Sequence, residues 1–223
     1  MLSTLRKLVI AVPCIAFASV SYATIISGAV SVGTGSFVKL SVPFADSSPY
    51  NTVGNDTFQN TNLYGFDEGQ NINITTDLNV DDVANGLGGG SGAGVLSAGT
   101  VVASHYIFFD PAASASQIGF VNFDSDILGI LSSTTNLSNS DFLINTGVTY
   151  LNPAMRGLEA GDSVTITGLR QITVDWTAST PGDYVRVLTA YSPGAVNLPE
   201  PGALALMGIG LVGFGFTRKI HKS

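Results

Sequence analysis

Between residues 36 and 191, apolar and polar residues alternate in several stretches with a period of two, the period of a half-buried β-strand. The alternation is clearest at 36–44, 71–80 and 170–177. One face of these strands would carry Val38, Leu40, Val42 and Phe44, then Ile72, Ile74, Thr76, Leu78 and Val80, and finally Ile172, Val174 and Trp176. The pattern predicts sheets with an apolar face.

Four further stretches are rich in β-branched and aromatic residues and are bounded by Gly, Pro, Asn or Asp, which is typical of strands. They lie at 100–109, 117–123, 162–169 and 183–191. No stretch of the body has the 3.6-residue period of a convincing amphipathic helix. Seven or more short strands without disulfides indicate an all-β fold, and we expect an antiparallel β-sandwich of jelly-roll type.

The segment NGLGGGSGAG at 85–94 contains too many glycines to form a strand. Such a segment could let the backbone approach a ligand closely. A flexible connection between strands is the interpretation that the composition favours.

The first 23 residues have the parts of a secretory signal peptide. A basic pair at 6–7 precedes an apolar stretch at 8–17, and Ser21 and Ala23 occupy the −3 and −1 positions. The pattern predicts export through the Sec machinery and cleavage by signal peptidase after Ala23. A cut after Ala18 is the alternative.

The chain ends with an apolar run at 202–216, followed by Arg218, Lys219 and Lys222. The run corresponds to roughly 23 Å of helix, against a hydrocarbon core of about 30 Å, so it predicts a transmembrane helix of marginal length. The basic residues keep this end in the cytoplasm, and the body then lies across the inner membrane. A buried helix of a soluble domain would not be apolar on every face.

Within this run, Gly208, Gly210 and Gly213 match the G-x-G-x-x-G fingerprint of dinucleotide-binding proteins. That site also needs an acidic residue about 20 positions further on, and no acidic residue follows Gly213. Small residues in an apolar run instead allow close helix packing in lipid. The membrane interpretation is therefore the better one.

The signal peptide, the Pro-Glu-Pro triplet, the glycine-rich apolar run and the basic end follow one another in an order that resembles the PEP-CTERM sorting signal. The resemblance covers 197–223 and assigns the motif to Pro199, Glu200, Pro201, Arg218 and Lys219. It implies a Gram-negative bacterium that makes extracellular polysaccharide. It also implies an exosortase in the inner membrane, which recognises and processes the tail. Leu198 stands where valine is usual, and Arg-Lys replaces Arg-Arg.

The body at 24–196 has a length that suits one domain. It contains 15 Asp and Glu against four Lys and Arg, a net charge of −11. We expect no nucleic-acid partner, because binding to nucleic acid needs a basic surface. The one cysteine of the chain lies in the signal peptide, so the body has no disulfide.

Few residues of the body suit catalysis. Alternation places His105, its one histidine, on a face with Ala103 and Ile107, which favours a packed, hydrogen-bonded side chain. No G-x-S-x-G elbow is present. A glycosidase needs two carboxylates that face one sugar. Asp67 and Glu68 are adjacent and would point to opposite faces of a strand, so Asp124 and Asp126 are the candidate pair.

Two acidic segments could hold Ca²⁺, which prefers oxygen ligands at short spacings. The candidate ligands are Asp77, Asn79, Asp81, Asp124 and Asp126. The first segment lacks the Gly and Glu positions of an EF-hand loop, so solvated turn carboxylates are the alternative. We expect no other cofactor.

Two classes of function remain. The first is a non-enzymatic surface or matrix protein associated with exopolysaccharide or biofilm, in which exposed aromatic residues could stack on sugars. Candidates for that role are Tyr50, Phe58, Tyr64, Phe66 and Tyr106, unless they fill the core. The second is a secreted polysaccharide-active enzyme that uses Asp124 and Asp126.

Overall fold

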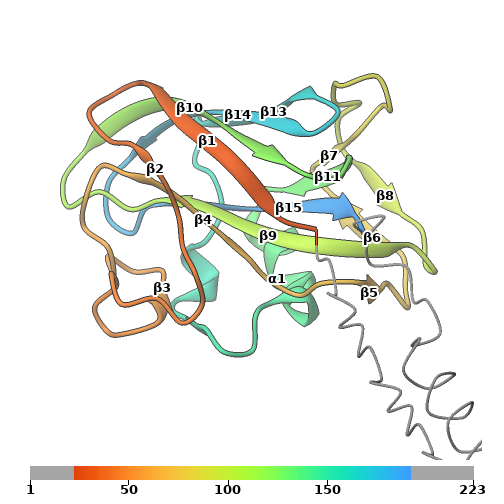
Figure 1. The fold of residues 1–223 in the computed structure, drawn as a ribbon, viewed down its shortest axis with the longest axis horizontal. Coiled ribbons are helices and arrows are strands. Elements are labelled where there is room, and N and C mark those ends of the chain that lie inside the picture. The colour runs from red at the N-terminus through yellow and green to blue at the C-terminus, as the bar shows by residue number, and fades with distance from the viewer. Residues whose placement is uncertain (1–22, 192–223) are drawn as a thin grey trace, which may run out of the picture. The chain divides into compact units, whose positions relative to one another are not determined.

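Two β-sheets packed face to face carry most of residues 23–191, the part of the chain that the computed structural model describes (Figure 1). The smaller sheet has four antiparallel strands in the order β1-β10-β14-β13 and forms the upper layer in Figure 1. These strands are β1 (Ile25–Val32), β10 (Ala115–Phe123), β14 (Gln171–Ala178) and β13 (Ser163–Gly168).

The larger sheet has seven strands in the order β2-β4-β9-β15-β11-β7, with β5 beside β9. Their bounds are β2 (Phe37–Lys39), β4 (Leu63–Asp67), β5 (Ile72–Asn73), β7 (Asp82–Val83), β9 (Val101–Phe109), β11 (Ile127–Leu131) and β15 (Asp183–Ala190). Neighbours are antiparallel except for β2 and β4 at one edge. The chain crosses between the sheets from β9 to β10 and back again to β11.

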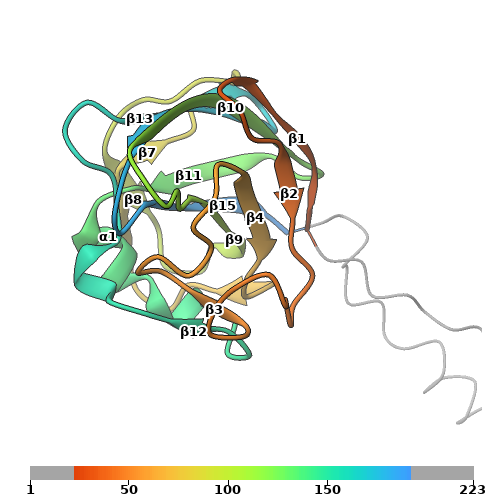
Figure 2. The ribbon, with the colours of Figure 1, turned by 90° about the vertical axis from the view of Figure 1, so that its left-hand side faces the viewer.

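Short elements complete the body. Strand β3 (Thr52–Val53) pairs in parallel with β12 (Thr149–Tyr150), and β6 (Leu78–Val80) pairs antiparallel with β8 (Gly94–Leu96). The helical elements are α1 (Thr134–Asn139), η1 (Asp141–Leu143) and η2 (Pro153–Met155), the last two of 3₁₀ type. Figure 2 shows α1, β3 and β12 on the side of the larger sheet that faces away from β1 and β10.

Each face of the larger sheet has its own hydrophobic core. Along β9, Ile107 and Phe109 pack between the two sheets, together with Trp176 of β14. Tyr106 and Phe108 of the same strand pack in the outer core, under the helices and loops. Strands β9 and β15 are therefore buried on both faces, whereas β14 alternates between buried and more exposed positions.

The predicted all-β class is confirmed, and the two sheets form a largely antiparallel sandwich. The four strands predicted at 100–109, 117–123, 162–169 and 183–191 are all present. On β14, all three apolar residues predicted to share a face are fully buried between the sheets. Jelly-roll topology stays a prediction, since the larger sheet has seven strands and a parallel edge pair.

Two predicted strands are shorter in the structure. At 36–44 only β2 is a strand, yet all four predicted side chains pack in or against the outer core. The stretch 71–80 divides into β5 and β6, and Thr76 between them is exposed. The prediction of one continuous strand there is wrong, because the chain leaves β9 after Asn73 and pairs with β8 instead.

Helix α1 was not expected from the sequence. Six residues are too few to establish a 3.6-residue period, so the pattern could not reveal it. Within residues 23–191, no helix has the length and apolar character needed to cross a bilayer. The signal sequence before Ala23 and the predicted transmembrane helix at 202–216 lie outside the described residues.

Candidate functional sites

Two of the three predicted calcium ligands near β6, Asp77 and Asp81, accept hydrogen bonds from protein donors. Asp81 accepts hydrogen bonds from the backbone N–H groups of Ser132 and Ser133, at 2.7 and 2.8 Å, and from Asn136 Nδ2 at 2.7 Å. It thereby holds the start of α1. Asp77 Oδ1 accepts from the N–H of Ala98 at 2.9 Å, and Asn79 is exposed on β6.

The second predicted pair, Asp124 and Asp126, lies in the bend between β10 and β11. Asp124 Oδ1 accepts from the N–H of Thr24 at 2.8 Å. Asp126 Oδ1 accepts from Arg170 Nε at 2.6 Å, and both of these side chains are more than half exposed. The two carboxylates thus have different partners, one at the start of β1 and the other at the turn between β13 and β14.

Across residues 23–191, no three His, Cys, Asp or Glu side chains come together in a way that could hold a metal ion. The structure therefore does not bring the predicted calcium ligands around one point. Chelation, described below, tests whether calcium binds.

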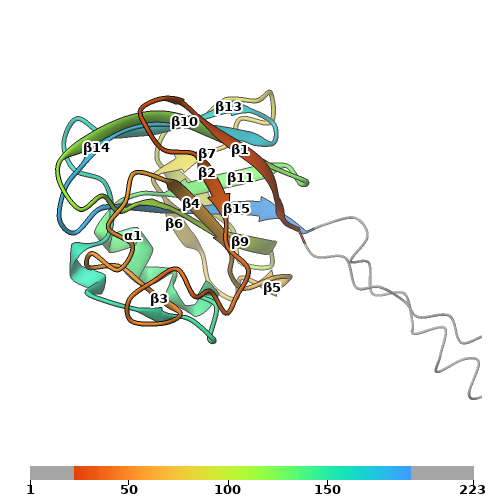
Figure 3. The ribbon, with the colours of Figure 1, turned by 60° about the vertical axis from the view of Figure 1, so that its left-hand side comes forward.

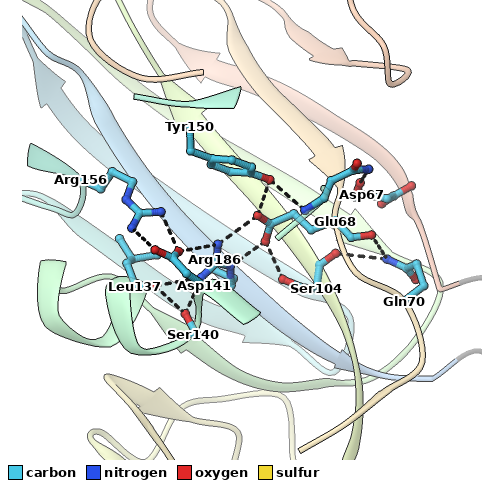
Figure 4. Close-up of polar contacts among 11 residues, drawn as sticks. Asp67, Glu68, Gln70, Ser104, Leu137, Ser140, Asp141, Tyr150, Arg156 and Arg186 are labelled. Atoms are coloured by element: carbon cyan, nitrogen blue, oxygen red, sulfur yellow. Dashed lines mark hydrogen bonds and ion pairs between the residues drawn. The ribbon is translucent and has the colours of Figure 1, made fainter. Parts of the chain in front are cut away.

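The most extensive polar cluster of the described body is buried, and sequence reasoning did not identify it. Glu68, which follows β4, and Arg186 of β15 have fully buried side chains. Arg186 Nε donates to Glu68 Oε2 at 2.6 Å, and Nη2 donates to Oε1 at 3.1 Å (Figure 4). Ser104 Oγ and Tyr150 Oη also donate to this carboxylate, at 2.6 and 2.7 Å. Four donor contacts therefore compensate the buried negative charge.

Arg186 also ties the helical segment to the sheet. Its Nη1 donates to the carbonyl oxygen of Leu137, at the end of α1, at 3.0 Å, and to Ser140 Oγ. Its Nη2 lies 3.5 Å from Asp141 Oδ1. Asp141 in turn accepts two hydrogen bonds from Arg156, at 2.9 and 2.8 Å. Figure 4 shows the two arginines approaching Asp141 from either side.

Burial and the charge of Glu68 determine the protonation states of Arg186 and Tyr150. Burial by itself would lower the pKa of Arg186, but the Glu68 carboxylate outweighs it and the pKa lies above its ordinary value. Burial, reinforced by the negative charge of Glu68, raises the pKa of Tyr150 well above its usual value. Arg186 also lies over the ring of Tyr106, 5.7 Å from its centroid. The cluster thus contains charged arginines and a neutral tyrosine, and its contacts fasten α1 to the larger sheet.

On the opposite face of the larger sheet, Asp67 forms a second cluster. Its Oδ1 lies 2.8 Å from His105 Nδ1, and its Oδ2 lies 2.9 Å from Lys39 Nζ. Burial would raise the pKa of Asp67, but hydrogen bonds from His105, Thr24 and Lys39 outweigh it, and the pKa is well below its ordinary value. His105 is fully buried, and its Nε2 lies 3.0 Å from Thr189 Oγ1. The packed, hydrogen-bonded histidine expected from the sequence is observed.

Most of the aromatic residues considered for sugar stacking belong to the core. Phe58, Tyr64, Phe66 and Tyr106 are buried in the outer core, where their rings pack against one another and against further aromatic rings. The stacking role is therefore wrong for these four. Tyr50 is 63% exposed and remains available.

One signal in the sequence could have revealed the Glu68–Arg186 pair. Arg186 interrupts the apolar strand DYVRVLTA, which is buried on both faces, and a buried charge needs a partner. The identity of that partner could not be read from the sequence, because 118 positions separate the two residues. The Pro-Glu-Pro triplet and the basic pair Arg218-Lys219 lie outside the described residues.

The chain joins an acidic all-β body to a tail that carries a sorting signal, which is the organisation of an exported, C-terminally sorted protein. A sequence model of the PEP-CTERM protein-sorting motif matches residues 197–219. The chain therefore carries the PEP-CTERM sorting signal that its C-terminal sequence resembles, and the motif implies export and sorting by an exosortase. No curated protein and no solved structure matches the chain.

Proposed function

We propose that this protein is delivered to the cell surface or the extracellular space and has a non-enzymatic role there, in association with exopolysaccharide or the biofilm matrix. Signal peptidase removes residues 1–23, and the tail holds the precursor briefly in the inner membrane. An exosortase then processes the tail near the Pro-Glu-Pro triplet. The observation that carries the proposal is the sorting motif at 197–219.

The partners of the carboxylates support a non-enzymatic body. Glu68 is enclosed and saturated with donors, so substrate has no access to it. Asp126 lines a hollow of about 310 Å³ between the glycine-rich segment and the β13–β14 turn, but Arg170 holds its carboxylate. Asp124 bonds to Thr24 instead and is not among the described residues that line this hollow. A glycosidase needs both carboxylates at one substrate.

Processing of the tail is tested in two hosts, one with an exosortase and one without. Mass spectrometry of surface material should show a form that lacks the residues after the triplet, in the first host alone. Glu200→Ala should block the conversion, whereas Asp46→Ala, a change at an exposed acid of the body, should not. Surface protein that retains residues 216–223 would contradict the proposal and make the tail an ordinary anchor.

The role of the body is tested with extracellular polysaccharide purified from a host that sorts such proteins. Retention of the secreted protein on the polysaccharide without new reducing ends supports a binding role. The alternative is a polysaccharide-active enzyme, which would release reducing ends. In that case Asp126→Asn should abolish the release, while Asp46→Asn should leave it unchanged.

A further inference from the structure

The backbone nitrogen of Thr24 lies at a carboxylate. It donates to Asp124 Oδ1 at 2.8 Å, and the N–H of Asp124 donates back to the carbonyl oxygen of Thr24 at 3.0 Å. The next residue, Ile25, pairs with Phe123 as the first register position of β1 on β10. Thr24 is therefore held at the start of an edge strand, in a fixed position relative to Asp124.

A second carboxylate that contacts Thr24, that of Asp67, already has a cationic partner in Lys39. Asp67 accepts from Thr24 Oγ1 at 2.6 Å and from the N–H of Ile25 at 3.0 Å, and its charge is balanced by Lys39, whose Nζ lies 2.9 Å away. Asp124 differs, because it takes part in none of the ion pairs formed among residues 23–191. Among residues 23–191, the Asp124 carboxylate accepts a hydrogen bond from one group, the backbone N–H of Thr24.

Cleavage after Ala23 would change the chemistry of that donor. In the uncut chain the Thr24 nitrogen belongs to a neutral peptide group with one hydrogen. In the cut chain it is an α-amino group, whose pKa of about 7.7–8.0 makes it a cation with three hydrogens at neutral pH. Cleavage therefore adds the attraction between two opposite charges to a hydrogen bond in which only the acceptor carried a charge before.

We propose that Asp124 is the binding site for the α-ammonium group that signal peptidase creates at Thr24. The new ion pair fastens Thr24, the residue before β1, to the bend after β10, so that processing strengthens the attachment of the edge strand β1 to the smaller sheet. The inference rests on the proposed export of the protein. The inference also distinguishes the two candidate cleavage sites, because only a cut after Ala23 creates an α-ammonium group at Thr24. A cut after Ala18 leaves residues 19–23 attached and keeps the Thr24 nitrogen a neutral amide.

The experiment compares two forms of the body, both ending at residue 196. One begins at Thr24 and the other at Ser19, and each is released from a fusion by a protease that leaves no extra residue. The described residues belong to a single compact unit, so both forms should fold. Unfolding midpoints are measured at pH 6 and pH 10, and the rate of α-amine acylation is measured at pH 8. Each form is also made with Asp124→Asn and, as the matched control, with Asp126→Asn.

The Thr24 form should have the higher unfolding midpoint at pH 6. The ion pair raises the pKa of the folded ammonium, so its contribution is complete below the unfolded pKa of about 7.7–8.0 and is lost as the pH rises through the folded value. The advantage should therefore disappear at pH 10. Asp124→Asn should remove it and should accelerate α-amine acylation at pH 8, by up to about tenfold for each unit by which the pKa of the amine falls. Asp126→Asn should change neither.

Equal midpoints of the Thr24 and Ser19 forms at pH 6 would overturn the proposal, as would an acylation rate that Asp124→Asn leaves unchanged. N-terminal sequencing of the exported protein tests the proposed function separately. An exported chain that begins at Thr24 but gains no stability overturns the docking and leaves export intact. A stable Thr24 form from a chain that is never exported supports the docking and overturns the proposed function.

Discussion

Replacing Glu68 by Gln should destabilise the body strongly, because the change leaves Arg186 buried without its charge partner. The carboxylate accepts two hydrogen bonds from Arg186 and one each from Ser104 and Tyr150. A glutamine retains one acceptor oxygen and turns an NH₂ group toward donors. Breaking one side of a buried ion pair costs about 3–5 kcal/mol. For a domain of this size that corresponds to a fall in melting temperature of roughly 6–20 °C.

The assay is urea denaturation followed by tryptophan fluorescence, because Trp176 is fully buried between the sheets and reports on unfolding. The matched control is Arg170→Gln, which breaks the exposed pair with Asp126. That pair should contribute about 0–1 kcal/mol, since solvent screens both of its charges. Each variant breaks one carboxylate–arginine pair, so the difference between their losses of stability measures the effect of burying the pair.

A double-mutant cycle separates the pair from its surroundings. Arg186→Met alone should be as damaging as Glu68→Gln, because it leaves the carboxylate uncompensated. The double variant should cost clearly less than the sum of the two, because it leaves no unpaired charge between these positions. A loss below about 1 kcal/mol for Glu68→Gln, or strict additivity in the cycle, would refute the reasoning.

Three further predictions concern the acids of the body. Burial, with Asp162 and Glu159 nearby, raises the pKa of Asp183 to about 7. Its contribution to stability is therefore complete below pH 4 and lost as the pH rises through about 7. Asp183→Asn should remove that loss, as denaturation midpoints at pH 4, 6 and 8 would show. Asp81→Ala should cost about 1–2 kcal/mol in urea denaturation, because it removes the acceptor at the start of α1. The melting temperature should be the same with chelator as with added calcium, and a lower value with chelator would reveal a bound cation.

Three of the four strands of the smaller sheet, β10, β13 and β14, were predicted from the sequence, whereas β1 was not. Strand β14 has one face in the core between the sheets and one face toward solvent, so its sequence alternates and its apolar residues are those that the structure buries. The two central strands of the larger sheet gave a weaker signal. Both faces of β9 and β15 are covered, and a doubly buried strand is a continuous apolar run without a period.

The outer core contains most of the features that the sequence did not predict. The alternating stretches at 36–44 and 71–80 contribute to it, but the rest of its cover is α1 and loops on the outer face of the larger sheet, which have no period of their own. Phe58 and Tyr64 were candidates for sugar stacking, but the loops that fold back over the sheet bury them in the outer core. Asp81 likewise looked like a metal ligand, since a carboxylate beside a turn can either coordinate calcium or accept hydrogen bonds from backbone N–H groups at the start of a helix.

The bend between β10 and β11 receives both ends of the body. The N–H of Thr24 reaches Asp124, and the N–H of Ala190, the last residue of β15, donates to the carbonyl oxygen of Asp126 at 2.8 Å. Figure 3 shows the start of β1 and the end of β15 on the same side of the sandwich. The two proposed cleavages, after Ala23 and near the Pro-Glu-Pro triplet, would therefore act on segments that adjoin the same corner of the described body. An antibody raised against any other part of this surface should recognise the membrane-held precursor and the released product equally well.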